Sequence, residues 1–269
     1  MTEIPDLNAR ELLEFYLDTG VDALLGEEPV DRFAAVEAPP VAPRQPSERP
    51  APAPIVTARP AATAAAVVAP DEAAMAARAA AKSAASLDEL RGILEGFDGC
   101  ALKATATRTV FADGNPQARV MLVGEAPGRD EDIEGLPFVG RSGKLLDQML
   151  KAIGLDRTSV YIANIVPWRP PGNRTPTPQE SAICLPFILR QIELADPDIL
   201  VCLGGPSAQT LLGIKDGITK TRGRWFTFDT GKREIRAIAT FHPAFLLRSP
   251  LQKRFAWRDL LAIRKALGG

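Results

Sequence analysis

Residues 124–132 read GEAPGRDED and are followed at 137–140 by PFVG, and the rest of the predicted fold is built around this stretch. An apolar, β-branched run precedes it at 119–123, and a helical pattern begins near Ser142. A strand, a glycine turn and a helix start often present backbone N–H groups to a ligand in α/β proteins. The turn holds four acidic residues and no phosphate-loop spacing. We therefore expect chemistry that develops a cation or orients a water molecule.

Strand-like and helix-like segments alternate through the last two thirds of the chain. This rhythm is typical of parallel strands joined by helical crossovers. We predict an α/β fold, namely a three-layer α/β/α domain with a central, mostly parallel four-stranded sheet. The expected strands are 119–123, 160–165, 199–203 and 236–240, and the expected helices are 143–153, 178–195, 207–212 and 252–267.

The residues that follow the four strands carry most of the polar chemistry. These strand exits are Gly124-Glu125, Asn164, Gly204-Gly205 and His242-Pro243. Ligands of parallel sheets bind at the carboxyl ends of the strands. The sequence therefore predicts one active cleft, to which all four exits contribute.

The N-terminal third differs in composition from the predicted domain. Residues 1–25 show the period of an acidic amphipathic helix, and residues 26–85 form an Ala/Pro-rich segment that we expect to be a disordered linker. Within it, residues 71–85 are Ala-rich enough to be helical on propensity alone. The capping-box pattern Ser86–Glu89 marks the start of a domain expected to span 86–269.

Charge is distributed unevenly along a chain of 269 residues with a net charge of −1. Residues 1–40 hold ten Asp and Glu against two Arg, and residues 201–269 hold thirteen Lys and Arg against four Asp and Glu. The basic part either faces a polyanion or is solvated surface. No long apolar run or signal pattern occurs, and three cysteines give no disulfide framework. We expect a cytoplasmic protein that does not enter a membrane.

Three motifs occur in order: GEAPG with GLPFVGRSGKLLD at 124–147, NIVPWRPPGNR at 164–174, and FHPAFLLR at 241–248. They resemble the uracil-DNA glycosylase superfamily, and family 4 most closely, over roughly residues 86–265. The resemblance implies a monofunctional hydrolase that releases uracil from single- or double-stranded DNA and leaves an abasic site, in base excision repair. It further implies a monomer that flips the target base into a pocket.

The resemblance also implies roles for individual residues of the pocket. Phe138 would stack under the flipped base, Asn164 would bond its Watson–Crick edge, and His242 would stabilise charge on the uracil O2. Ala126 would contact uracil; it stands where some branches carry a water-activating Asp. The residue types alone also allow a core Phe, a turn-capping Asn and a structural His.

Without that Asp, another carboxylate or the backbone must orient water, and the resemblance favours Glu125 and Glu131, with Asp132 as an alternative. Each could equally be a surface or helix-start charge. Contacts to DNA are implied for the residues of three loops, including an apolar wedge chosen from 245–247. The expected DNA contacts are Ser142, Lys144, Asn173, Arg174, Leu246 as the wedge, and Arg248.

Family 4 enzymes usually hold a [4Fe–4S] cluster through four thiolates. The matching positions here are Phe97, Cys100, Trp168 and Cys184, so two of the four are large aromatic residues. We expect no cluster unless an unrecognised ligand or a partner chain completes a site with Cys100 and Cys184. Cys202 lies in an apolar run and is expected in the core.

Two other functions remain open at this point. One is a uracil-DNA binding protein with little or no turnover, and the other is a nucleotide-binding α/β domain without a role on DNA. The acidic N-terminal arm could fold over the basic cleft, recruit a repair protein or serve only solubility.

Overall fold

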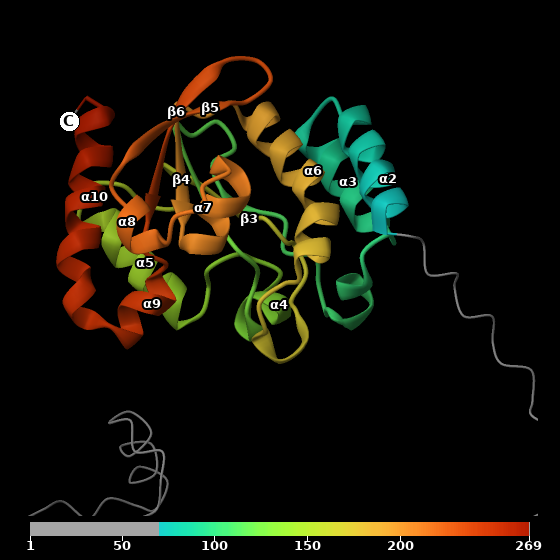
Figure 1. Cartoon of the computed structure of the whole chain (residues 1–269), viewed down its shortest axis with the longest axis horizontal. Coiled ribbons are helices and arrows are strands. Elements are labelled where there is room, and N and C mark those ends of the chain that lie inside the picture. The colour runs from blue at the N-terminus through green and yellow to red at the C-terminus, as the bar shows by residue number, and fades with distance from the viewer. Residues whose placement is uncertain (1–69, 269) are drawn as a thin grey trace, which may run out of the picture. The chain divides into compact units, whose positions relative to one another are not determined.

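The computed structural model describes residues 70–268 of the chain (Figure 1). The predicted acidic helix at 1–25 and the predicted linker up to residue 69 lie outside the described residues. No helix in the described part is long and apolar enough to cross a membrane.

The centre of the domain is a sheet of six strands in the order β1-β3-β2-β4-β6-β5. The four middle strands are parallel: β3 (Tyr161–Asn164), β2 (Val120–Gly124), β4 (Ile199–Leu203) and β6 (Glu234–Thr240). These are the four predicted strands. The edge strands β1 (Asp113–Gly114) and β5 (Trp225–Asp229) are antiparallel to their neighbours. The predicted number of four strands was therefore wrong. The two edge strands were missed because β1 has only two residues and β5 is partly exposed and lacks a long apolar run.

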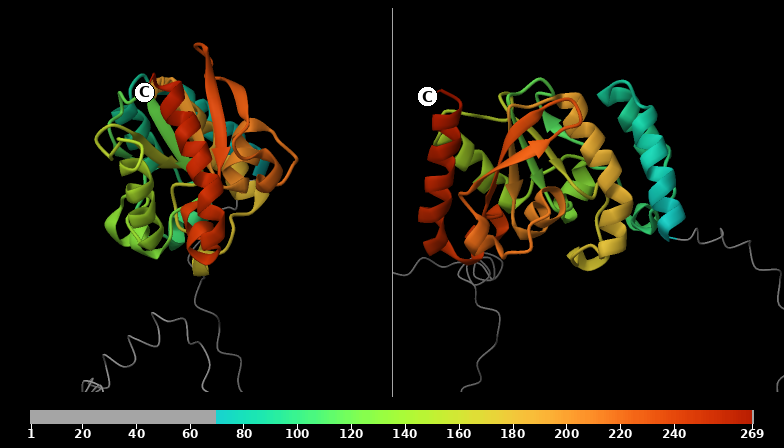
Figure 2. Two further views of the ribbon diagram at one scale, coloured as in Figure 1. Left: turned by 90° about the vertical axis from the view of Figure 1, so that its left-hand side faces the viewer. Right: turned by 45° about the horizontal axis from the view of Figure 1, so that its top comes forward.

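Helices cover both faces of this sheet, as the three-layer prediction requires. In Figures 1 and 2, α5 and α10 lie on one side of the sheet and α6 on the other. The helices are α2 (Pro70–Ser83), α3 (Leu87–Gly96), α4 (Arg129–Glu134), α5 (Arg141–Lys151), α6 (Pro178–Ala195), α7 (Gly205–Leu212), α8 (Ile218–Thr221), α9 (Pro243–Arg248) and α10 (Lys253–Ala266). Short 3-10 turns are η1 (Ala101–Thr105), η2 (Pro171–Asn173) and η3 (Pro250–Gln252).

Alternation along the strands divides the apolar core into two clusters. In β2, Met121 and Val123 pack with α6, whereas Val120 and Leu122 pack with α5 and α10. Successive side chains of a strand point to opposite faces, so a strand buried on both sides reads as a continuous apolar run. Burial on both faces fixes the register, and because the four middle strands are parallel, their carboxyl ends lie at one edge of the sheet.

Helix α2 agrees with the helical propensity of the Ala-rich residues 71–85, and its packing corrects their assignment to a disordered linker. Its buried residues Ala73, Ala77 and Ala81 are spaced four apart and pack in the same core cluster as α6. Small side chains let two helices approach closely, which compensates for the lack of large apolar groups. The folded part of the chain therefore includes this helix, ahead of the expected start at residue 86. Ser86 still caps the next helix, since its side chain accepts a hydrogen bond from the Glu89 N–H at 3.2 Å.

Candidate active site

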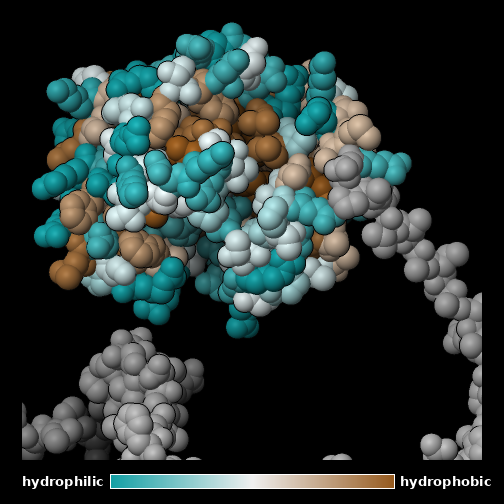
Figure 3. Space-filling model, viewed as in Figure 1, coloured by the Kyte–Doolittle hydropathy of each residue, from teal (hydrophilic) through white to brown (hydrophobic). Residues whose placement is uncertain are grey.

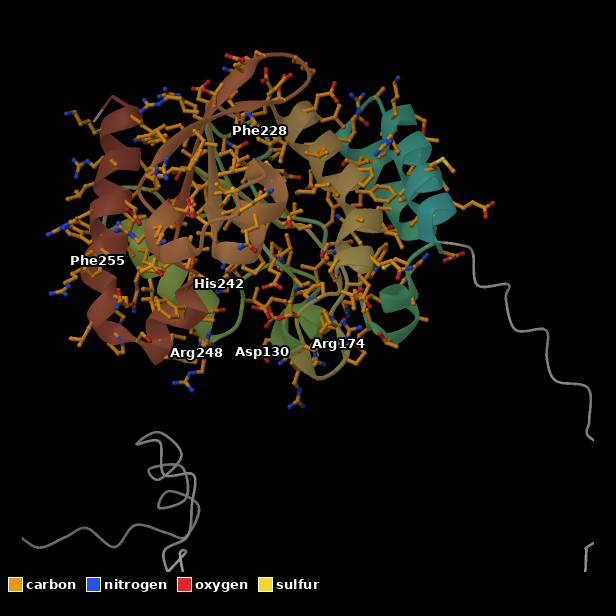
Figure 4. The ribbon with its side chains drawn as sticks, in the orientation of Figure 1. Asp130, Arg174, Phe228, His242, Arg248 and Phe255 are labelled. Atoms are coloured by element: carbon orange, nitrogen blue, oxygen red, sulfur yellow. The ribbon has the colours of Figure 1, made fainter. Side chains whose placement is uncertain are left out.

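A cavity of about 600 Å³ opens at the edge where the parallel strands end. Its lining includes one polar or glycine residue from each predicted strand exit: Glu125, Asn164, Gly204 and His242. The predicted convergence of the four exits is therefore confirmed. Figure 4 shows Arg174 and Arg248 on opposite sides of this region with His242 further in, and Figure 3 shows a notch with a mostly hydrophilic rim on the same side of the molecule.

Phe138 enters the cavity from the loop between α4 and α5. Its backbone lies in the left-handed region, with φ of 56°, which costs a bulky residue about 1–2 kcal/mol. Phe138 is 4% exposed, and the centroid of its ring is 5.4 Å from that of His242 at an interplanar angle of 31°. Gly124 makes room for it, because a Cβ there would lie 2.7 Å from the Phe138 Cζ.

Asn164, at the end of β3, is 5% exposed and also depends on Gly124, whose Cβ would lie 2.4 Å from the Asn164 Oδ1. Its Oδ1 is buried and has no hydrogen-bond partner within the described part of the chain. A buried acceptor without a donor costs about 1–3 kcal/mol. An amide kept in that condition on the wall of a cavity is suited to accept a hydrogen bond from a ligand.

His242 is the N-cap of α9, and its Nδ1 accepts a hydrogen bond from the Ala244 N–H at 3.1 Å. In the neutral ring the proton is therefore on Nε2, which is free to donate. Burial, and secondarily the positive charge of Arg248, lowers the pKa of His242 to about 4. The imidazole is consequently a neutral donor at physiological pH.

The carboxylates of the turn have separate tasks. Glu131 accepts hydrogen bonds from Gly128 N–H at 3.0 Å and Gly140 N–H at 3.2 Å, so it joins the two loops of the cavity. Asp132 accepts from the Thr107 N–H and Oγ1 at 2.7 and 2.9 Å, which removes it as an alternative for orienting water. Glu125 lines the cavity without a side-chain hydrogen bond inside residues 70–268, and burial raises its pKa.

The structure places the expected DNA-contact residues in three groups. Ser142, Asn173, Arg174 and Arg248 line the cavity, as does Ala126 among the expected uracil contacts. Lys144 is exposed on the first turn of α5, outside the lining.

Leu246 is the expected DNA contact that fails. It is 1% exposed and packs in the core with α5 and α10, whereas Leu247 is 37% exposed. The choice of Leu246 as the wedge was therefore wrong. A helix of six residues is too short for periodicity to show which of two adjacent leucines is buried.

Sequence reasoning missed the apolar wall of the cavity. This wall includes Leu203, Ile218 and Phe241. Leu203 and Phe241 lie in or beside strands and looked like ordinary core residues, and Ile218 lies in a four-residue helix that gives no periodic signal. Leu203 and Phe241 each stand one residue before a predicted strand exit, which was a detectable signal, whereas Ile218 carried none.

The residues at the family cluster positions do not fit a [4Fe–4S] group. Such a cluster takes four thiolates, and here two thiols, Cys100 and Cys184, stand with Sγ atoms 4.0 Å apart. Trp168 is 1% exposed and donates from Nε1 to the Thr109 Oγ1 at 3.1 Å, and Phe97 makes an edge contact with Phe187. Among the described residues, no group of three or more His, Cys, Asp or Glu is arranged to hold a metal.

The hydrogen bond to Cys184 lowers the pKa of the Cys100 thiol, and the pKa of Cys184 is raised well above its usual value by the same contact and by burial. The Cys184 thiol therefore donates to the sulfur of Cys100. Cys202 is fully buried within β4, as expected for a core residue, and burial raises its pKa to about 12.

If the aromatic rings fill the cluster position, replacing Trp168 by alanine should destabilise the fold by about 3–5 kcal/mol, the usual cost of removing a buried large ring. Urea unfolding would measure this loss. Trp257, which is 42% exposed on α10, provides the control, because its replacement leaves no internal cavity. Equal losses for the two variants would contradict the role of Trp168 as a filler.

Comparison with known proteins agrees with this geometry. A family model described as the uracil DNA glycosylase superfamily matches residues 111–261. A type-4 uracil-DNA glycosylase of Archaeoglobus fulgidus is 41% identical over 61% of this chain and 85% of its own length. The proteins of the same name from Thermotoga maritima and Sulfurisphaera tokodaii are 46% and 40% identical, over 56% and 67% of this chain and 77% and 84% of their own lengths. The chain therefore belongs to the uracil DNA glycosylase superfamily and is placed by these relatives on its family 4 branch.

Proposed function

We propose that this chain is a monofunctional uracil-DNA glycosylase, which hydrolyses the bond between uracil and deoxyribose and leaves an abasic site for base excision repair. The names of its relatives support this activity. The observation that carries the proposal is the cavity itself. In it, an amide oxygen with no partner among residues 70–268 lies near an aromatic ring and a neutral imidazole donor. The amide matches the hydrogen-bonding edge of a flipped uracil, the aromatic ring matches its face, and the imidazole matches its O2 atom.

The amide of Asn164 supplies the discrimination between bases. Uracil has a donor at N3 and an acceptor at O4, which pair with the Oδ1 and the amino group of one Asn side chain. Cytosine has an acceptor at N3 and a donor at N4. Because the buried Oδ1 would then face another acceptor, cytosine leaves the amide unpaired and is rejected.

Bond cleavage then follows from the other groups of the cavity. When the bond between C1′ and N1 breaks, its electron pair moves to uracil, and the Nε2–H of His242 donates to the negative O2. The sugar becomes oxocarbenium-like, and the carboxylate of Glu125 stabilises that positive charge. Water adds its oxygen to C1′, and the proton it loses passes to solvent or to the departing base. Glu131 keeps the loops in place through its two backbone contacts.

We assign binding of the DNA backbone to the rim of the cavity. Ser142 at the start of α5, the Asn173–Arg174 turn and Arg248 would contact phosphates. Lys144, further along α5, would add a peripheral contact. Arg174 is already held by Glu180 through two hydrogen bonds of 2.8 and 2.7 Å, which fixes its direction. Leu247 would fill the space that the base vacates.

The two leucines of α9 should separate stability from activity. Leu247→Ala is expected to lower excision from double-stranded DNA and leave the free energy of unfolding nearly unchanged, because the side chain is exposed. Leu246→Ala should cost about 2–5 kcal/mol of stability, because it leaves a cavity. Initial rates and urea unfolding would measure both. The opposite pattern would restore Leu246 as the wedge.

A uracil-containing oligonucleotide tests the proposed function. Incubation followed by alkali should break the strand at uracil, and omission of alkali should leave it intact, since a monofunctional enzyme does not cut the backbone. A retarded band without cleavage would instead support a binding protein with little turnover, which Ala126 suggested. Neither cleavage nor retardation would refute both functions. Hypoxanthine and mismatched thymine in the same gel would define the range of bases.

A further inference from the structure

The conformation of Phe138 requires an external constraint. Its φ of 56° is one that a bulky side chain seldom adopts. Its carbonyl oxygen is so close to the first turn of α5 that a Cβ at Gly143 would lie 1.6 Å away. The backbone of Gly143 stops the carbonyl from moving closer to α5, but it does not hold the carbonyl in place, because glycine has no side chain that could bind it. A second contact must determine where the peptide lies.

Arg157, in the turn between α5 and β3, makes that contact. Its Nη1 donates to the Pro137 carbonyl at 3.1 Å and its Nη2 donates to the Phe138 carbonyl. The guanidinium is itself held by two carboxylates, since Nη1 is 2.6 Å from the Asp113 Oδ2 and Nε is 2.8 Å from the Asp147 Oδ1. Four groups from β1, α5 and the loop thus converge on one side chain that is 25% exposed.

We propose that Arg157 is a positioning residue for the uracil pocket, which fixes the backbone from which the Phe138 ring projects by binding the carbonyls on both sides of the Phe138 Cα. The inference rests on the proposed function, because it assigns a task within that pocket. Arg157 is absent from the cavity lining and would act only through Phe138. A planar guanidinium can bind two carbonyls and two carboxylates at once, whereas a lysine ammonium has three donors and no fixed plane.

The chain contains a matched control for this arrangement. Arg233 also binds two backbone carbonyls, those of Asp196 and Pro197 at 3.0 and 3.1 Å. It also pairs with two carboxylates, those of Asp196 and Asp198 at 2.8 and 3.1 Å. Asp196 is likewise a left-handed residue, with φ of 47°. This cluster lies before the start of β4, at the end of the strand opposite to the cavity.

The test compares Arg157→Gln, Arg157→Lys and Arg233→Gln in the full chain. We expect Arg157→Gln to lose about 10- to 100-fold in kcat, since small misplacements of a binding group have effects of that size. Free uracil should bind Arg157→Gln more weakly than the parent protein, and Arg157→Lys should fall between the two. Arg233→Gln should keep the kcat and uracil affinity of the parent, even where its melting temperature falls as far as that of Arg157→Gln.

Equal kcat and equal uracil affinity for Arg157→Gln and Arg233→Gln would overturn the inference. If Arg157→Gln does not fold, Arg157→Lys decides, and parental kcat with parental uracil affinity in that variant would overturn it. A parent protein that releases no uracil would refute the proposed function alone. Calorimetry with free uracil would then still decide on Arg157, because unchanged affinity in Arg157→Gln would exclude a positioning role.

Discussion

Replacing Asn164 by alanine is expected to reduce uracil release on the order of 10³-fold, because a site built to hydrogen-bond its substrate discriminates strongly through that bond. The free energy of unfolding should stay the same or rise. The Oδ1 of Asn164 has no partner in the described part of the chain, so its removal relieves a buried unpaired acceptor. Single-turnover rates on a uracil oligonucleotide and urea unfolding would measure the two effects.

Gln191 provides the control for this prediction. It is a buried amide, 4% exposed, whose amino group donates to the Phe111 carbonyl at 3.3 Å and to the Tyr161 hydroxyl at 3.0 Å. It lies outside the cavity lining. Gln191→Ala should lose stability and keep its excision rate, the reverse of Asn164→Ala. A loss of stability without a loss of activity in Asn164→Ala would show that the amide is structural.

The parts of the fold that sequence predicted are those fixed by local pattern. The runs at 120–124 and 199–203 are apolar throughout, as is typical of parallel strands buried on both faces, and the polar residues that follow such strands meet at one edge. Asn164 and His242 were found for this reason. Their environment could not be predicted. The lack of a partner for the Asn164 Oδ1 within the described residues and the hydrogen bond on the His242 Nδ1 both depend on neighbours that only the fold brings together.

The missed features depend on contacts between distant segments. Helix α2 packs through alanines, whose composition resembles that of a linker until a partner helix is known. Glu131, which the resemblance favours as a catalyst, lines the cavity, and the bonds of its oxygens to N–H groups three and nine residues away could not be predicted from the sequence. Arg157 gave no signal at all, since its partners span residues 113–147.

Replacing His242 by alanine is expected to reduce uracil release by about 10²–10³-fold, the usual loss on removal of one donor to a developing oxyanion. The donor is the neutral ring, because Nδ1 accepts from the Ala244 N–H. The pH dependence of the parent protein's rate should therefore not show the protonation step of an ordinary imidazole. It should show no histidine-dependent change between pH 7 and pH 5, since the pKa of His242 is lowered to about 4.

The lowered pKa of His242 also makes the free energy of unfolding depend on pH, and a variant without this histidine reveals its share of that dependence. Between pH 6.5 and pH 4 the unfolded chain takes up a proton on His242 and the folded chain does not, so stability falls as pH falls through this window. The full loss is about 3 kcal/mol, given roughly 1.4 kcal/mol for each pH unit of difference. His242→Ala should remove that part of the slope and leave the contribution of carboxylates such as Glu125.

Because the chain has a single histidine, the imidazole resonances in an NMR titration belong to His242 without further assignment. A midpoint near pH 4 would agree with a neutral donor buried in the cavity. A midpoint near pH 6.5, with a rate that rises as the ring becomes protonated, would mean that the imidazolium stabilises the departing uracil. Acid would then increase uracil release over the same range in which the neutral-donor mechanism leaves it unchanged, so the two profiles separate the mechanisms directly.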